Sequence, residues 1–197
     1  DNVVVRQAAL SERVGTATLA VAAEGHEGQN TIGEIVANPR VQTMERIAVE
    51  TTTLDRAVTD AGLSRVDLIK LDVEGFEPAV LRGAVETLGR FAPILQVEVE
   101  EHALATHGFT KAELVELLAG AGYEAWMFDP ATAQLTASDE PGALEGNVIA
   151  APSGWTPPRL GDGPVRAPYL SVVATARNDD HGGNLLRRMQ LFVSTLA

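Results

Sequence analysis

Cysteine is absent from all 197 residues of the sequence. Its absence excludes disulfide bonds, cysteine nucleophiles and zinc sites built on thiolates. It also agrees with a reducing compartment, so we expect a cytoplasmic protein. No hydrophobic run approaches the roughly 20 residues of a membrane helix, and the N-terminus lacks the basic and then hydrophobic pattern of a signal peptide. We therefore expect no membrane insertion.

Positive charge is scarce as well. The sequence has 15 lysines and arginines against 27 aspartates and glutamates, which gives a net charge of −12. An acidic surface repels the phosphates of nucleic acids, so we expect no nucleic-acid partner. Hydrophobic residues make up 45% and charged residues 21%, which is typical of a folded globular protein. The length is sufficient for one α/β domain with its own core.

Both ends of the sequence read as interior segments. The chain starts without methionine, directly in the extended run Val3-Val4-Val5, and it ends in residues 191–197, which read as a helix. We therefore expect this chain to be a fragment of a longer polypeptide.

Hydrophobic patterning predicts alternating strands and helices. From residue 63 the order is strand, helix, strand, helix, strand, strand, which is typical of a doubly wound α/β sheet. The last two strands have no helix between them and predict an antiparallel hairpin at one edge. The predicted strands are Val3–Leu10, Thr16–Ala22, Met44–Thr51, Val66–Val73, Ile94–Val99, Tyr123–Phe128 and Asn147–Ala151. The predicted helices follow Thr52 as far as Gly62, span Glu77–Arg90, and follow Thr110.

Three details refine this pattern. Thr16–Ala22 and Met44–Thr51 are expected to pair antiparallel across a loop at residues 24–40. Two helices start with the pattern of a capping box, Thr52 with Asp55 and Thr110 with Glu113. The helix Glu77–Arg90 has one buried stripe, made of Val80, Leu81, Ala84, Val85 and Leu88.

The strand Val66–Val73 is hydrophobic without regular alternation. Strands covered on both faces, as in a parallel sheet, have this pattern. We therefore predict that Val66–Val73 lies centrally in the sheet.

Acidic residues gather where two predicted strands end. Asp72, Glu74 and Glu77 end the strand Val66–Val73, and Glu98, Glu100, Glu101 and His102 end the next one. Ligands of open α/β sheets bind beyond the carboxyl ends of the strands. Grouped carboxylates can deprotonate a hydroxyl, hold a metal ion or bind sugar hydroxyls. We assign a function to Asp72 and Glu74, and we interpret Glu100 and Glu101 as solvated acids.

The basic residues near this edge are harder to assign. Lys70 lies inside a hydrophobic strand, where it can pair with one of the acids or extend to solvent. His26, His107 and His181 are isolated in polar segments and are interpreted as surface residues. No two histidines have the spacing of metal ligands, so we predict no metal site built on histidines and assign no metal ligands. The sequence does not tell whether the protein requires a metal.

One stretch of the sequence resembles the FkbM family of methyltransferases. The pattern consists of Thr53-Leu54-Asp55, Val66-Asp67-Leu68-Ile69-Lys70-Leu71-Asp72-Val73-Glu74-Gly75-Phe76-Glu77 and Val80-Leu81-Arg82-Gly83-Ala84. Two flanking segments agree with it, Asn2–Gly15 and Ile94–Glu98. The resemblance covers residues 1–152.

This resemblance implies a class I, Rossmann-like fold and methyl transfer from S-adenosylmethionine, usually to oxygen. It places the catalytic residues Asp72 and Glu74 beside the acceptor, with Asp72 also near the transferred methyl group. The predicted contacts with the acceptor are Lys70, Glu77, Glu98 and His102. The predicted contacts with the cofactor are Ala9, Leu10, Ser11 and Asp72.

The sequence departs from the family in one respect. The family binds its cofactor through a glycine-rich loop after the first strand and an acid at the end of the second, and neither is found here. The segment Gly25-His26-Glu27-Gly28 is no substitute, because it follows no suitable strand and opens no helix. We expect the missing parts to precede Asp1, and the fragment to be inactive alone.

The C-terminal segment has a resemblance of its own. Residues 153–168 are rich in proline and glycine and read as a linker. Residues 170–189 resemble the first strand and helix of a nucleotide-sugar glycosyltransferase domain. The alternative is a terminal strand and helix of the first domain. We therefore predict a methyltransferase domain at 1–152, a linker at 153–168 and the start of a glycosyltransferase-like domain at 169–197.

Three functions remain open at this point. The first is an O-methyltransferase that acts on a sugar or glycan hydroxyl. The second is a non-catalytic α/β module that binds a carbohydrate or a partner protein and is attached to a glycosyltransferase. In the third, the glycosyltransferase portion carries the main activity. The sequence gives neither the acceptor nor the oligomeric state.

Overall fold

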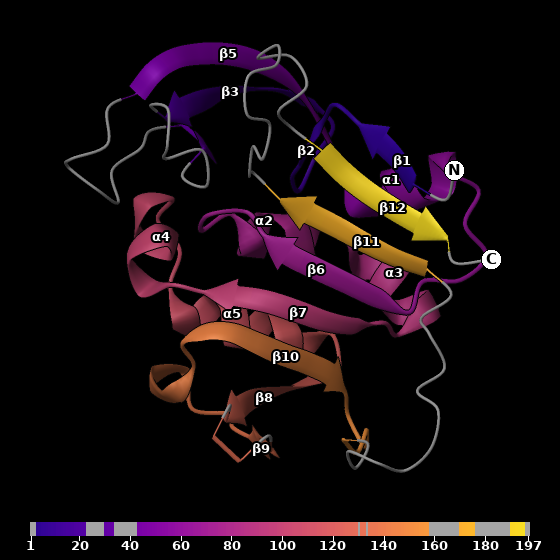
Figure 1. Cartoon of the computed structure of the whole chain (residues 1–197), viewed down its shortest axis with the longest axis vertical. Helices are drawn as coiled ribbons and strands as arrows, with labels where there is room; N and C mark the ends of the chain where they lie inside the picture. The colour runs from indigo at the N-terminus through magenta and orange to yellow at the C-terminus, as the bar shows by residue number, and fades with distance from the viewer. Residues whose placement is uncertain are drawn as a thin grey trace.

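The computed structural model describes residues 3–22, 30–33, 43–129, 131–132, 134–157, 170–175 and 190–195. These residues form a mixed α/β fold with two sheets (Figure 1). The larger sheet has eight strands in the order β1-β12-β11-β6-β7-β10-β8-β9. The smaller sheet has four strands in the order β2-β5-β3-β4.

The bounds of the elements are as follows. The strands are β1 Val3–Arg6, β2 Ala9–Leu10, β3 Gly15–Ala22, β4 Thr31–Ile32, β5 Thr43–Thr52, β6 Leu68–Asp72, β7 Ile94–Val99, β8 Tyr123–Asp129, β9 Gln134–Ala137, β10 Gly146–Pro152, β11 Leu170–Thr175 and β12 Gln190–Thr195. The helices are α1 Leu54–Asp60, α2 Glu77–Arg82, α3 Val85–Phe91, α4 Glu101–Thr106 and α5 Lys111–Gly120, with a 3₁₀ turn at Pro141–Ala143. None of these helices has the length and hydrophobicity needed to cross a membrane.

The centre of the larger sheet is parallel. β6 pairs in parallel with β7 on one side and with β11 on the other. The chain passes from β6 to β7 through α2 and α3, which is the crossover that a parallel pair requires. The predicted strand Ile94–Val99 is confirmed as β7. The carboxyl ends of β6 and β7 therefore meet at one edge of the sheet.

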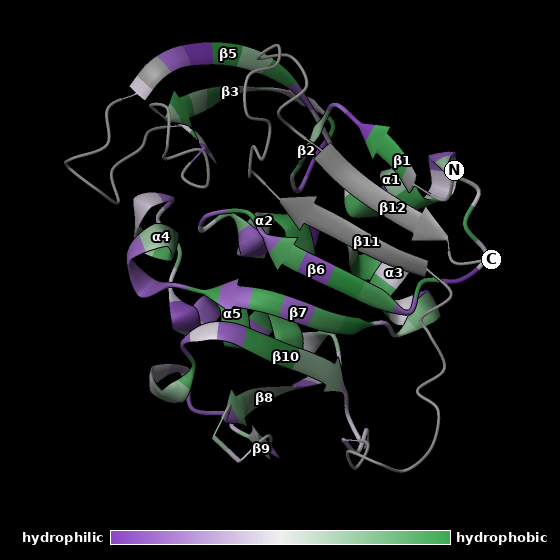
Figure 2. Cartoon of the chain, in the orientation of Figure 1, coloured by the Kyte–Doolittle hydropathy of each residue, from purple (hydrophilic) through white to green (hydrophobic). Residues whose placement is uncertain are grey.

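Helices cover one face of the larger sheet. In Figure 1, α1, α2, α3 and α5 lie behind the strands, and the main core joins their hydrophobic side chains to that face of β6, β7 and β10. Burial alternates along β6, so that Ile69 and Leu71 are buried while Lys70 and Asp72 are only partly buried. The predicted central position of this strand is confirmed, because β6 lies between β11 and β7, while the described residues cover its second face only in part. Figure 2 shows hydrophilic residues interrupting β6 and β7.

The smaller sheet contains the predicted antiparallel pair. β3 and β5 pair over their whole length, from Gly15 opposite Thr51 to Ala22 opposite Thr43. The predicted single strand Val3–Leu10 is divided, because β1 joins the larger sheet and β2 joins the smaller one. Of the predicted loop at 24–40, residues 31–32 form β4, and residues 24–29 and 34–40 lie outside the described part.

The first helix is capped by Thr53 and not by Thr52. The Thr53 hydroxyl accepts a hydrogen bond from the amide of Arg56 at 3.0 Å. Asp55 does not complete a capping box, because its carboxylate accepts from the amides of Glu86 at 3.0 Å and Thr87 at 2.7 Å. Asp55 thus supports the start of α3 from a neighbouring helix.

The predicted helix Glu77–Arg90 is two helices. The break falls at Gly83, where an added Cβ would lie 2.2 Å from the carbonyl oxygen of Ser11. The close approach of this backbone interrupts the helix and turns α3 in a new direction. Val80, Leu81, Ala84 and Leu88 are buried as predicted, whereas Val85 is 67% exposed and does not belong to the stripe.

Only one of the two hydrogen bonds of the predicted capping box at α5 is confirmed. The Thr110 hydroxyl accepts from the amide of Glu113 at 3.1 Å. The Glu113 side chain forms an ion pair with Arg82 on α2. This exposed contact joins the neighbouring helices α2 and α5 at the surface instead of closing a box at Thr110.

The strands β8 and β10 differ in part from the predicted edge hairpin. β8 and β10 are antiparallel as predicted, but β10 lies inside the sheet between β7 and β8. The edge is formed by β9, which the sequence did not predict, and α4 was also missed. Trp155 follows β10 and packs edge-on against Trp126 of β8, with ring centroids 5.6 Å apart. The start of the predicted linker therefore packs on the sheet.

The C-terminal segment supplies two strands. Residues 170–175 form β11 within the predicted strand, and β11 joins the larger sheet beside β6. Residues 190–195 form β12, so the predicted helix is wrong there. The run Leu191-Phe192-Val193-Ser194-Thr195 is rich in residues that favour strands. Residues 158–169 and 176–189, with most of the predicted linker and turn, lie outside the described part.

Candidate active site

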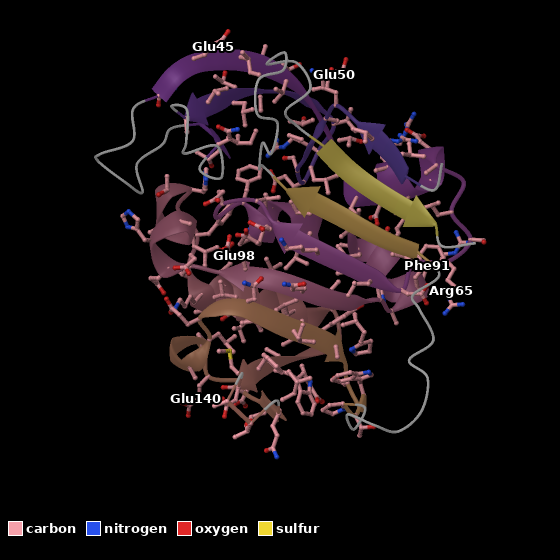
Figure 3. The ribbon with its side chains drawn as sticks, viewed as in Figure 1. Glu45, Glu50, Arg65, Phe91, Glu98 and Glu140 are labelled. Atoms are coloured by element: carbon pink, nitrogen blue, oxygen red, sulfur yellow. The ribbon has the colours of Figure 1, made fainter. Side chains whose placement is uncertain are left out.

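Three carboxylates meet at the carboxyl ends of β6 and β7. Leu71 pairs with Val97, so the residues that follow them, Asp72 and Glu98, lie side by side on the partly exposed face. Glu74 joins them from the turn after β6, and one oxygen of each carboxylate lies within 4.8 Å of the other two. Figure 3 labels Glu98 at this edge. We call Asp72, Glu74 and Glu98 the acid group.

Backbone geometry places Glu74 in this group. Glu74 has φ 55° and Gly75 has φ 92°, so two successive residues adopt the left-handed conformation. That conformation is costly for a residue with a side chain. A Cβ on Gly75 would lie 2.2 Å from the carbonyl oxygen of Ala103. Glycine is therefore required here both by the turn and by the close packing of α4.

Glu77 lies beneath the turn and not in the acid group. Its side chain is only 1% exposed, and its Oε1 accepts hydrogen bonds from the amides of Val73 at 3.1 Å and Gly75 at 3.4 Å. The predicted contact of Glu77 with an acceptor would need the turn to open. Its described contacts instead support the conformation of the turn.

Burial and mutual repulsion change the acidity of these groups. Burial raises the pKa of Glu98 to about 8, and the negative charges of Asp72 and Glu74 add to the rise. Burial also raises the pKa of Glu77 to about 7, against the opposing hydrogen bonds from the turn amides. At neutral pH the Glu98 carboxyl therefore holds a proton beside its acidic neighbours. Such a pair can exchange a proton with a bound hydroxyl.

Lys70 provides the countercharge for the acid group. Its Nζ lies 2.7 Å from Oδ2 of Asp72, and both side chains are partly exposed on the open face of β6. Of the two uses that the sequence left open for Lys70, pairing with an acid is therefore the one observed. The contact is a charge-assisted hydrogen bond in which Lys70 donates to Asp72.

Of the two histidines near the site, His107 differs from its interpretation as a surface residue, while the predicted contact of His102 with the acceptor stays a prediction. His102 lies exposed on α4. His107, interpreted as a surface residue, is half-buried at the end of α4, and its Nε2 lies 2.9 Å from Oγ1 of Thr31 and 3.2 Å from the carbonyl oxygen of Glu74. The sequence gave no signal for either His107 or Thr31, because the atom they share is a backbone carbonyl.

The predicted cofactor contacts at β2 are enclosed by the protein. Ala9, Leu10 and Ser11 are 4%, 6% and 8% exposed. The amide of Ser11 donates to the carbonyl of Thr52 at 2.9 Å, and its carbonyl lies against Gly83. In this conformation these three residues do not offer a surface to an adenine ring.

The acid group could also hold a divalent cation. Carboxylate oxygens are the usual ligands of Mg²⁺ and Ca²⁺, and the three oxygens are close enough to share one ion. No metal ligands were assigned from the sequence, and this grouping leaves that prediction untested.

A cavity of about 540 Å³ lies elsewhere in the molecule, between α5 and β8. Its walls are Val115, Leu118, Ala119, Tyr123, Glu124, Ala125, Ala137, Ser138, Asp139 and Ser153. None of the predicted site residues lines it.

Comparison with known proteins assigns the chain to a family. The sequence model of the methyltransferase FkbM domain matches residues 1–125, more than half of the chain and all of the acid group. No curated protein and no solved structure matches. The match gives no support to a glycosyltransferase domain in residues 169–197. This chain belongs to the FkbM family of methyltransferases, whose methyl donor is S-adenosylmethionine.

Proposed function

We propose that the protein methylates a hydroxyl oxygen of a sugar or glycan. The observation that carries this proposal is the acid group on the open face of the sheet, at the carboxyl ends of β6 and β7. Ligands of doubly wound sheets bind at this edge. Carboxylates are suitable partners for the several hydroxyls of a sugar, because each oxygen accepts hydrogen bonds.

We assign proton transfer to Asp72 and Glu74. A hydroxyl becomes a better nucleophile as its proton moves to a carboxylate, and the gain from such general-base catalysis is about 10²–10⁴-fold. Lys70 keeps Asp72 in place through their 2.7 Å contact. Glu98 contributes a protonated carboxyl that can donate a hydrogen bond to the acceptor. His102, exposed on α4, is proposed to contact the acceptor at the rim.

S-adenosylmethionine supplies an electrophilic methyl group when it is bound. The described residues do not fit it completely, because Ala9, Leu10 and Ser11 are buried. We therefore assign to this chain only the acceptor side of the reaction. The class I, Rossmann-like architecture also remains a proposal, supported by the parallel strands β11, β6 and β7.

The test is product analysis with the natural-length protein that contains this chain. The protein is incubated with methyl-labelled S-adenosylmethionine and, in parallel, with sugars and amines of similar size. The proposal expects label in an O-methyl sugar. Label found only on nitrogen or carbon would contradict it. No transfer to any acceptor would favour the alternative of a non-catalytic carbohydrate-binding module.

A further inference from the structure

The smaller sheet is tied to the turn that carries Glu74. Thr31 comes from β4 of that sheet, and its Oγ1 lies 2.9 Å from Nε2 of His107 and 3.5 Å from the carbonyl oxygen of Glu74. Nε2 of His107 lies 3.2 Å from the same carbonyl oxygen. In Figure 1, α4 lies below the smaller sheet and beside the carboxyl end of β7, and His107 is the C-cap residue of this helix.

The carbonyl oxygen of Glu74 is the acceptor in these contacts. A carbonyl oxygen only accepts hydrogen bonds, so its donors are the hydroxyl of Thr31 and, in the tautomer with a proton on Nε2, the ring N–H of His107. In that tautomer the same N–H is shared with Oγ1 of Thr31, which accepts from it at 2.9 Å. Burial lowers the pKa of His107, while its hydrogen bond to Glu74 acts in the opposite direction. The ring is further held by Phe76, whose centroid lies 5.2 Å away at an interplanar angle of 78°. His107 is thus fixed from two sides.

Glu74 needs such support. Its φ of 55° is unfavourable for a residue with a side chain, and conformations of this kind cost about 1–3 kcal/mol and persist only where the surroundings enforce them. Glu77 holds the amides on either side of Glu74. His107 and Thr31 hold its carbonyl oxygen. The direction of the Glu74 carboxylate depends on both sets of contacts.

We propose that Thr31 and His107 are positioning residues that hold the carbonyl of Glu74 and thereby aim its carboxylate into the acid group. This inference rests on the proposed function of that group. Side chains from two distant segments converge on one backbone atom of a third, and the residue that contains this atom contributes a carboxylate to the site. The smaller sheet is therefore part of the catalytic apparatus.

Two substitutions of His107 separate hydrogen bonding from packing. His107→Phe keeps an aromatic ring against Phe76 but removes the donor. His107→Gln keeps an N–H near the position of Nε2. Thr31→Val removes the hydroxyl with little change of shape at a buried position of β4. Thr106→Val is the matched control, because its hydroxyl bonds the carbonyl of His102 and not the turn.

The expected result is a loss in turnover and not in binding of the methyl donor. In the natural-length protein, kcat should fall about tenfold or more in His107→Phe and Thr31→Val, since small displacements of a catalytic group are costly. His107→Gln should stay within about threefold of wild type, and the KM for S-adenosylmethionine should not change. Equal losses in His107→Phe, His107→Gln and Thr106→Val would overturn the proposal.

A double-mutant cycle provides the sharper test. If His107 acts through Glu74, then His107→Phe should cause no further loss of kcat in a Glu74→Gln background. Full additivity of the two losses would mean that His107 acts independently, and would overturn the proposal.

Hydrogen exchange distinguishes this proposal from the proposed function. Exchange at the amides of Gly75 and Phe76 should accelerate in His107→Phe and not in His107→Gln, whether or not a methylated product is found. If exchange accelerates in His107→Phe but wild type transfers no methyl group, the proposed function is refuted and the positioning contact is supported. Unchanged exchange in His107→Phe would refute the contact itself.

Discussion

At the scale of single residues, Glu98 should make the stability of the protein depend on pH. Its pKa is raised by burial from 4.5 to about 8, so between these values the folded protein holds a proton that the unfolded chain has released. Stability therefore falls as the pH rises through this window. Glu98→Gln removes this contribution. When the pH is raised from 5 to 9, the melting temperature of Glu98→Gln should fall by a few degrees less than the melting temperature of wild type.

The control for Glu98 is Glu100→Gln, since Glu100 is exposed at the start of α4. Thermal melts of both variants across the pH range check the prediction. Parallel curves for wild type and Glu98→Gln would contradict the raised pKa.

The contacts of Glu77 predict that its side chain stabilises the folded protein. Glu77→Ala leaves the amides of Val73 and Gly75 without their acceptor, which should cost about 2–3 kcal/mol of unfolding free energy. Glu77→Gln keeps an acceptor oxygen and should be close to wild type at pH 6, measured by denaturant titration. A fully stable Glu77→Ala variant with weakened acceptor binding would instead support the direct contact predicted from the sequence.

At the scale of elements, Gly83 controls how α2, α3 and β2 fit together. Gly83→Ala places a Cβ 2.2 Å from the carbonyl oxygen of Ser11, which is a backbone atom and cannot move aside as a flexible side chain could. We expect a loss of about 1–3 kcal/mol or more, as for other overpacked sites. Gly89→Ala is the control, because open space surrounds Gly89 on α3, and it should stabilise the protein by about 0.5–1 kcal/mol. Chemical denaturation measures both, and equal effects would refute the close approach.

Asp55 supports α3 from outside that helix. Its two carboxylate oxygens accept from the first-turn amides of Glu86 and Thr87. Asp55→Ala should therefore cost about 1–2 kcal/mol, the range of helix caps. Asp60→Ala removes only an exposed ion pair with Arg56 and should cost less than about 0.5 kcal/mol. Two equal losses in unfolding free energy would exclude this capping role.

At the scale of the whole molecule, the sequence pattern predicted those features that depend on residues close together in the chain. β7, the β3–β5 pair and the N-cap at Thr110 follow from periodicity and turn chemistry. The acid group was predicted because parallel strands bring their carboxyl ends to one edge. The same pattern of strand ends selected Asp72 and Glu74, and the family resemblance agreed with that choice. Glu77, which was predicted in the same cluster, lies beneath the turn instead.

The errors arose from contacts distant in sequence. The break at Gly83 depends on the backbone of Ser11, and Asp55 reaches a helix 31 residues away. His107 and Thr31 meet a carbonyl that lies 33 and 43 residues from them, and a carbonyl leaves no residue type to recognise. The position of β12 in the larger sheet likewise depends on its pairing with β1, which is distant in the sequence, and with β11.

The central claim is that the acid group acts on the acceptor hydroxyl. The most direct test is the rate of methyl transfer by the natural-length protein carrying Asp72→Asn or Glu74→Gln, compared with Glu100→Gln. Our account predicts that at least one of the two variants loses about 10²-fold or more in kcat, while Glu100→Gln keeps the rate of wild type. Unchanged methyl transfer in both Asp72→Asn and Glu74→Gln would contradict it.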